Sequence, residues 1–461
     1  MKKILKGVIL PALIVFAIAL ALADRYARPR AEMAVAFKAK TLCAAAYISG
    51  RDILSSEIED VSAGDLNFLK VFRTKKAVDS VTVSFFGLHP ATAVFREGIG
   101  TTLAIGKTPE QLRRETSGAV AAPPANPSLL WPEGNRVDIS LAPASINRKM
   151  LNSLIDSAFS EPDNPLRTRA IVIVYDGRVI AEKYAPGFDA DMPLKGWSMA
   201  KSVTNALVGI MVDQGKLHLE DKSLLQAWQT EGDPRAAISL DNMLHMSSGI
   251  DFNETYSVDP ESDISMMLFR TGNAAGFAAT KPADKPPGTF FEYASGTTNL
   301  LCRIIREKIN DDAIYHAFPK RELFHKIGAH SAILERDASG TFVGSSFVYA
   351  TARDWARLGL LYANDGIWNE ERILPEGWME YCRTPAPAAP QGEYGAHFWL
   401  KLEGQNDRSD LPAGIFHMSG HEGQFVSISP EKKLVVVRLG FTLEQDAWNQ
   451  GEFVSKILET L

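Results

Sequence analysis

Residues 170–184 read AIVIVYDGRVIAEKY, and this stretch constrains the fold more than any other part of the chain. Two runs rich in β-branched residues flank Asp176-Gly177, a dipeptide that favours a tight hairpin turn. Further β-rich runs follow only in the C-terminal third, at residues 394–402, 423–430 and 432–440. Between them lie helical patterns and loops, and the last 14 residues of the chain predict a closing helix. Strands, then helices, then strands predict an α/β (α+β) fold, with an antiparallel sheet flanked by helices and a mostly helical insertion.

The segment GWSMAKSVTNALVGIMVDQGKL, residues 196–217, predicts a helix that ends near Gly215. Ser198 lies near its start, and Lys201 follows three residues later on the same face. Backbone N–H groups at a helix start lack intrahelical partners and carry partial positive charge, which suits a nucleophile that must stabilise an oxyanion. Ser-x-x-Lys is also expected about once by chance in a chain of this size, and serine is a common N-cap.

Composition narrows the class of protein without naming a function. The chain has 461 residues with ordinary apolar and charged fractions, enough for two or three domains. Its net charge of -6 argues against a nucleic-acid partner. No CxxC or HExxH spacing occurs, so the sequence gives no support for a zinc site.

The first 24 residues have the plan of a secretory signal. A basic start is followed by an apolar run over residues 8–23 that ends in Ala-Leu-Ala. The run is also nearly long enough to span a bilayer as an uncleaved anchor, so residues 5–23 form a possible membrane tether. We expect an exported protein, either periplasmic or anchored to the inner membrane and facing the periplasm.

The chain divides into four parts by composition. Residues 1–24 are the signal or anchor, 25–116 an accessory region, 117–134 a linker rich in proline and alanine, and 135–461 the main domain. The accessory region contains one clear strand candidate, residues 81–86, and we expect it to pack beside the main domain and cover part of a cleft. No disulfide pair can be chosen among the three cysteines, Cys43, Cys302 and Cys382, and Cys302 fits a buried helical position.

Two further motifs follow the Ser198 helix. Tyr293-Ala294-Ser295 lies on a loop before a helical pattern, and a tyrosine there can relay a proton if a cation is near. His421-Glu422-Gly423 comes immediately before a β-rich run, which would point the N–H of Gln424 along a strand edge. Taken alone, the tyrosine motif is also consistent with a tyrosine that only packs its ring. The histidine motif alone is also consistent with a hairpin corner that carries a surface histidine.

Together, Ser-x-x-Lys, Tyr-x-Ser and His-x-Gly resemble the penicillin-recognising serine hydrolases. This family includes class C β-lactamases, DD-peptidases, D-aminopeptidases, related esterases and 6-aminohexanoate-dimer hydrolases. The resemblance extends from about residue 171 to the C-terminus and includes MLHMSSGIDFNE, PPGTFFEYASG and YATARDWARLGLLYANDGIWNEERILPEGW. It implies a β-lactamase/transpeptidase-like fold.

The resemblance also implies a role for each motif. Ser198 would be the nucleophile that forms an acyl-enzyme, with Lys201 holding or accepting its proton. Tyr293 would pass a proton to the leaving group, and whether it or Lys201 is the general base stays open. The N–H groups of Ser198 and Gln424 would form the oxyanion hole. Ser295 would orient Lys201 or the substrate amide. No metal or organic cofactor is required.

Departures from the family pattern point to a substrate class. His421 stands where many β-lactamases carry lysine, which offers a permanent charge to a substrate carboxylate. Gly423 is kept, and Ser295 replaces the usual asparagine and its amide donor. Both changes favour esters or small linear amides, as for a carboxylesterase or a 6-aminohexanoate-dimer-type amidase. A D-aminopeptidase, DD-peptidase or weak β-lactamase is the alternative within the family.

Two other readings compete. GWSMA is close to the Gly-x-Ser-x-Gly elbow of α/β-hydrolases, but the fifth residue is Ala200 and no short β-run leads directly into Gly196. From another class, the protein could be a catalytically idle module that binds peptidoglycan fragments. A serine-reactive probe that fails to label Ser198 would support that reading.

Overall fold

The computed structural model describes residues 2–116, 120–121, 123, 128–160, 166–259, 261–402, 411–444 and 447–461, without the side chains of residues 2–24 and 65. Its centre is an antiparallel five-stranded sheet in the order β12-β13-β14-β5-β6. These strands are Phe416–Gly420, Gln424–Ser429, Leu434–Gly440, Thr168–Tyr175 and Arg178–Tyr184. The strand that begins the domain therefore pairs with the last one, and the predicted hairpin at Asp176-Gly177 is confirmed.

Alternating side chains of the central sheet enter two separate cores. On β5, Val172 and Val174 join the large core, which also contains apolar residues of α5 (Ala200–Asp213) and α11 (Ala352–Ala363). Their neighbours Ile171 and Ile173 join a smaller core with α4 (Arg148–Ser157) and α13 (Gln450–Leu458). A strand alternates its side chains between faces, so helices cover both faces of this sheet. Helix α13 confirms the closing helix expected from the sequence.

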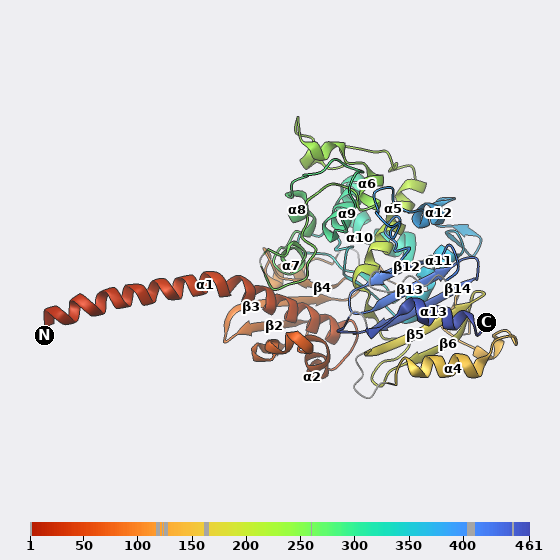
Figure 1. Ribbon diagram of the computed structural model, residues 1–461, viewed down its shortest axis with the longest axis horizontal. Coiled ribbons are helices and arrows are strands. Elements are labelled where there is room, and N and C mark those ends of the chain that lie inside the picture. Colours follow the sequence, from red (N-terminus) through yellow and green to blue (C-terminus); the bar gives the residue numbers. More distant parts are fainter. Residues whose placement is uncertain are drawn as a thin grey trace.

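The helical insertion lies between β6 and α11. Figure 1 shows its helices α5 to α10 on the side of the sheet away from α4. Its elements are β7 (Leu194–Lys195), η4 (Trp197–Met199), α5, η5 (Gln226–Trp228), η6 (Pro234–Ala237), α6 (Leu240–Leu244), α7 (Asp263–Phe269), α8 (Ala274–Ala279), α9 (Ser295–Ile309), α10 (Asp312–Phe318), η7 (Pro319–Phe324), β8 (Ile333–Leu334) and β9 (Val348–Ala350). Shorter pieces elsewhere are η3 (Ile139–Leu141), β10 (Ile367–Trp368), β11 (Glu371–Arg372) and α12 (Trp378–Arg383).

The accessory region is one long helix on a small antiparallel sheet. Helix α1 runs Lys2–Tyr47, and its first half extends away from the rest of the molecule (Figure 1). The sheet has the order β1-β2-β3-β4, with strands Arg73–Lys76, Ser80–Phe85, Leu88–Arg96 and Gly100–Leu103. The predicted strand 81–86 is the second of these four. Short helices α2 (Ile53–Ser56), η1 (Glu57–Val61), η2 (Gly64–Val71) and α3 (Pro109–Arg113) complete the region.

A membrane-spanning helix is not found among the residues with described side chains, since none of their helices is both long and apolar enough. The three cysteines are buried free thiols. Residues 117–119, 122 and 124–127 of the predicted linker 117–134 lie outside the described residues. Its described end lies against α11, where buried Arg357 donates from Nε to the Pro132 carbonyl at 2.9 Å.

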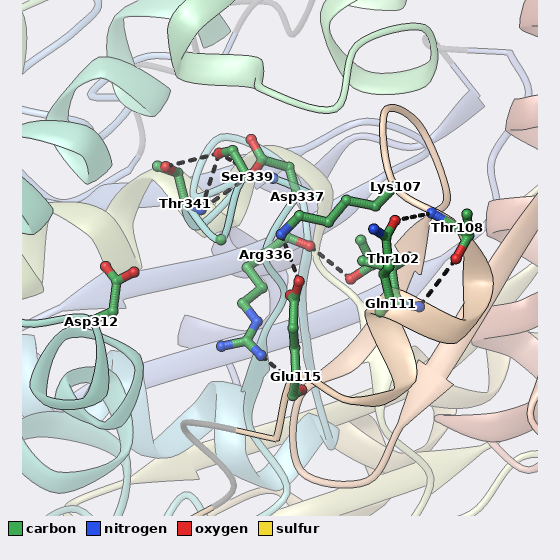
Figure 2. A network of polar contacts seen from close by, with 12 residues as sticks. Thr102, Lys107, Thr108, Gln111, Glu115, Asp312, Arg336, Asp337, Ser339 and Thr341 are labelled. Atoms are coloured by element: carbon green, nitrogen blue, oxygen red, sulfur yellow. Dashed lines mark hydrogen bonds and ion pairs between the residues drawn. The ribbon is translucent and has the colours of Figure 1, made fainter.

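Buried polar contacts hold the accessory region against the main domain. Lys40 on α1 forms an ion pair with Glu335, and the hydroxyl of Thr101 on β4 donates to the same carboxylate at 2.7 Å. Figure 2 shows the neighbouring contacts: the Thr102 hydroxyl donates to the Arg336 carbonyl at 2.9 Å, and the Arg336 guanidinium donates to the Glu115 carbonyl at 3.1 Å.

The expected strand over residues 394–402 is wrong. Only single bridges form there, between Tyr394 and Trp399 and between Trp399 and His417. The chain turns back between them, because the Gly395 N–H donates to the Phe398 carbonyl at 2.9 Å and His397 takes a left-handed φ of 61°. The alternation of apolar residues reflects burial of a tight turn, a pattern that a strand also produces.

Candidate active site

Ser198 lies in a strained turn between a short strand and a helix. β7 leads directly into Gly196, η4 contains Ser198, and α5 continues from Ala200. The expectation that no short β-run leads directly into Gly196 is therefore wrong, because a two-residue strand is too short to detect by periodicity. Trp197, immediately before the serine, has φ 49°. A bulky residue in the left-handed region is strained, and such strain persists where the surroundings fix the backbone.

Lys201 is the centre of the polar contacts around Ser198. Its Nζ lies 3.0 Å from Ser198 Oγ, 3.0 Å from Ser295 Oγ and 3.2 Å from the Ser345 carbonyl oxygen. The side chain is 1% exposed. Burial lowers the pKa of Lys201 to about 8, although the charge of Glu254 opposes this shift. A lysine with such a pKa is available as a base near neutral pH.

The partners of Lys201 determine which hydrogen bonds it makes. The Ser345 oxygen is a carbonyl and can only accept. Ser295 Oγ donates its proton to Glu254 Oε1 at 2.5 Å, so it must accept from Lys201. A neutral amine has two protons and one lone pair, and these two acceptors use both protons. The lone pair of neutral Lys201 is therefore left for the hydroxyl of Ser198.

Glu254 is a site residue that the sequence did not single out. Its carboxylate accepts from both the hydroxyl and the backbone N–H of Ser295, the latter at 2.8 Å. Burial raises the pKa of Glu254, and the charge of Lys201 opposes this. The only sequence signal was its position at the end of MLHMSSGIDFNE, a stretch recognised for its family likeness.

Tyr293 packs over the lysine. Lys201 Nζ lies 4.6 Å from the centre of the Tyr293 ring. The ring also packs against Tyr394, edge-on at 5.8 Å, and against Trp399 at 5.3 Å. The tyrosine is on the loop immediately before α9, as the sequence predicts. Tyr293 is thus next to Lys201, the residue with which it would exchange a proton.

The third motif forms the hairpin loop between β12 and β13. Gly420 pairs with Gln424 across this loop. A Cβ added to Gly420 would lie 2.1 Å from the Gly196 carbonyl oxygen, so only glycine permits this strand end to pack on the nucleophile turn. The start of β13, which contains Gln424, therefore packs against η4, which contains Ser198.

Side chains of Gln424 and of the neighbouring strand β14 stabilise the hairpin loop through hydrogen bonds. The Gln424 amide exchanges hydrogen bonds with the backbone of Gly440, donating at 2.7 Å and accepting at 3.0 Å. Gly423 has φ 78°, and a Cβ there would lie 2.2 Å from the guanidinium of buried Arg438. The Arg438 guanidinium donates to the Gly423 carbonyl at 2.6 Å. Only the backbone of Gln424 therefore remains for the site.

His421 and Glu422 face the residue that precedes the nucleophile. The exposed His421 ring stacks on Tyr256 at 5.0 Å and meets Trp197 edge-on at 5.5 Å. Trp197 Nε1 donates to Glu422 Oε2 at 2.7 Å. The structure thus brings Ser198, Lys201 and Ser295 into hydrogen bonding, whereas His421 takes part through ring packing.

The family profile named Beta-lactamase matches residues 162–444 of the chain. The match covers more than half of the protein, and it includes all three motifs and the strands and helices that carry them. The protein belongs to the β-lactamase family and is a serine hydrolase, and the family resemblance inferred from the motifs is confirmed.

Individual relatives place the chain within this family. It is 27% identical over 313 residues to the 6-aminohexanoate-dimer hydrolase of Paenarthrobacter ureafaciens, covering 63% of this chain and 77% of that protein. A Bacillus anthracis structure described as such a hydrolase has 23% identity and a TM-score of 0.53, over 67% of this chain and 80% of its own. A family VIII carboxylesterase has 12% identity and a TM-score of 0.53, over 69% and 97%. These structures confirm the fold.

Proposed function

We propose that this protein hydrolyses esters and small linear amides through an acyl-enzyme on Ser198. The observation that carries the proposal is the position of buried Lys201 Nζ, 3.0 Å from Ser198 Oγ and 3.0 Å from Ser295 Oγ. Neutral Lys201 accepts the Ser198 proton as Oγ attacks the substrate carbonyl carbon. The N–H groups of Ser198 and Gln424 stabilise the oxyanion, and each such donor is typically worth about 3 kcal/mol.

The proton taken from Ser198 is then transferred to the leaving group. Tyr293, packed over Lys201, passes it to the leaving alcohol or amine as the tetrahedral intermediate collapses. A water molecule then attacks the acyl carbon, giving its proton to the same pair and releasing the acid. Ser295 holds Lys201 in place while its own hydroxyl is fixed by Glu254.

Esters and linear amides are favoured by the way the site uses its polar groups. Ser295 is engaged by Lys201 and Glu254 and has no hydroxyl proton left for a substrate amide. His421 replaces the lysine that would hold a substrate carboxylate, and its ring packs on Tyr256. The 6-aminohexanoate-dimer hydrolase relative fits a linear amide or ester of this kind.

We also propose that the protein is exported. The basic start and the apolar run over residues 8–23 support passage across the inner membrane, with the catalytic domain on the periplasmic side. Because helix α1 continues from residue 2 to residue 47, the run leads directly into the accessory region where it is not cleaved.

The test is labelling with a fluorophosphonate probe, followed by intact-mass measurement and peptide mapping. We expect one adduct, on Ser198. Ser198→Ala should remove it. Ser202→Ala is the matched control, because Ser202 lies on the same helix but its hydroxyl donates to the His397 carbonyl at 2.8 Å, away from the Lys201 amine.

A preparation shown to react with the probe would then be assayed without the probe. Its kcat/KM would be compared for esters, linear amides, D-peptides and β-lactams. The highest values for esters or linear amides would support the substrate class, and a preference for D-peptides or β-lactams would contradict it. A folded protein without an adduct would mean that Lys201 does not activate Ser198, and the idle binding module would become the better reading.

A further inference from the structure

The accessory region exposes a cluster of large apolar side chains at one end of its sheet. The members of this apolar tip are Phe68 (45% exposed), Val71 (57%), Phe86 (77%) and Leu88 (62%). Ring contacts connect them through the region's own core, from Phe68 to Phe72, then Phe85, then Phe86, with centres 4.7–6.2 Å apart. Leu88 pairs with Phe85 across β2 and β3. Neighbouring exposed apolar residues of this size mark an interaction surface.

Two cations accompany the apolar tip. Lys70 lies between Phe68 and Val71 in sequence, and Arg73 begins β1 opposite Ser84, two residues before Phe86. Both side chains are exposed, and neither forms a hydrogen bond or ion pair with any residue that the structure describes. An apolar centre with free cations matches the chemistry of an anionic phospholipid surface, which offers acyl chains beneath negative headgroups.

The apolar tip lies where α1 leaves the accessory region. His89, next to Leu88, is 3.7 Å from Glu32 on α1. Glu32 follows the end of the apolar run, residue 23, by nine residues, which is about 14 Å of helix. Figure 1 shows the first half of α1 leading away from the molecule beside the turn between β2 and β3. A bilayer that holds the apolar run would thus lie next to the tip.

We propose that the apolar tip docks on the phospholipid bilayer, as a second contact beside the N-terminal tether. Phe68, Val71, Phe86 and Leu88 enter the boundary between headgroups and acyl chains, and Lys70 and Arg73 bind lipid phosphates. Two contacts fix the orientation of the enzyme on the membrane, which a single helix cannot do. The inference rests on the tether in the proposed function but not on the hydrolase chemistry.

The test places an environment-sensitive fluorophore at the tip of the full-length chain, reconstituted at one copy per nanodisc. Cys43, Cys302 and Cys382 are buried, so an introduced surface cysteine is labelled selectively. Leu88→Cys reports the tip. Val78→Cys is the control, since Val78 is 95% exposed but lies in the turn at the opposite end of β2. Nitroxide-labelled lipid is the quencher, in discs with and without phosphatidylglycerol.

We expect nitroxide lipid to quench the fluorophore at position 88 by about twofold or more in discs with phosphatidylglycerol, and to leave position 78 unchanged. Quenching should fall in Lys70→Gln/Arg73→Gln. Quenching should also fall in Phe86→Asn, because this change removes an apolar ring from the tip. Asparagine is chosen since it tolerates the φ of 49° at this position.

Equal quenching at positions 88 and 78 would overturn the proposal. So would a spectral shift at position 88 that depends on protein concentration without lipid, which would identify a second copy as the occupant. A chain that does not enter the discs would reject the tether and the docking together. Fluorophosphonate labelling of the same sample would show separately whether the proposed hydrolase activity holds.

Discussion

Lys40 in the accessory region and Lys201 in the catalytic domain are both buried lysines, yet their surroundings differ in one respect. Lys40 contacts the carboxylate of Glu335 directly. Lys201 contacts two hydroxyls and a carbonyl, and its nearest carboxylate, Glu254, is reached only through Ser295. Burial lowers the pKa of both ammonium groups.

Direct contact with a carboxylate separates a structural lysine from a chemical one. The charge of Glu335 raises the pKa of Lys40 against the effect of burial, and the contact joins two parts of the chain that lie 295 positions apart in sequence. A hydroxyl between Lys201 and its carboxylate weakens that stabilisation and leaves one position of the amine for the nucleophile. The same residue type at the same depth thus serves either packing or proton transfer.

The largest effect is expected from Lys201→Met. Loss of the base should lower kcat/KM by about 10³-fold, within the range known for general acid–base groups. The free energy of unfolding should change little or rise, because methionine removes a buried amine. Steady-state kinetics and urea unfolding measure the two quantities. Near wild-type turnover by the folded variant would assign the base to another group.

Lys40→Met should show the opposite pattern. It leaves the Glu335 carboxylate buried without its cation, which typically costs about 3–5 kcal/mol. The kcat/KM of the remaining folded protein should stay near that of wild type. Lys40→Met/Glu335→Met is the control and should recover most of the stability. If Lys40→Met lowers kcat/KM as strongly as Lys201→Met, the distinction between the two lysines fails.

The pH dependence of kcat/KM tests the proposed role of Lys201. With neutral Lys201 as the proposed base and a pKa of about 8, kcat/KM should rise as pH increases through about 8. The charge of Glu254 raises this pKa, so Glu254→Gln should move the rising limb to lower pH. We also expect an activity loss of about tenfold, because Ser295 loses its charged acceptor. If kcat/KM instead decreases as pH rises through about 8, Lys201 acts in its protonated form, which would point to Tyr293 as the base.

The smallest effect is expected from Glu422→Gln. It weakens the hydrogen bond that Trp197 Nε1 donates across the hairpin, a charge-assisted contact worth roughly 1.5–3 kcal/mol at most. Glutamine keeps an acceptor, so kcat should fall only several-fold with KM nearly unchanged. Glu431→Gln is the control, because Glu431 lies in the turn between β13 and β14 and pairs with Arg383. A change confined to KM would mean that Glu422 contacts substrate instead of positioning the turn.

The main elements were predictable because they depend on local patterns. The hairpin at Asp176-Gly177, the α5 helix, the loop position of Tyr293 and the closing helix all follow from spacing and turn residues. Strand 394–402 failed because burial of a turn produces the same alternation as a strand. Three of the four strands in the accessory region were missed. Strand β1 is exposed and polar, β3 contains Pro90, and β4 spans only four residues.

The family and the order of the three motifs follow from the sequence alone, because each motif is a local pattern of residue types. Which groups meet in the site depends on the tertiary structure. Glu254 lies 41 positions from Ser295, and Lys201 lies 94 positions from it, yet all three form one chain of hydrogen bonds. The pKa of Lys201 likewise depends on burial by distant segments and on a carboxylate that the sequence did not mark. Such long-range contacts follow from packing, and no local pattern contains them.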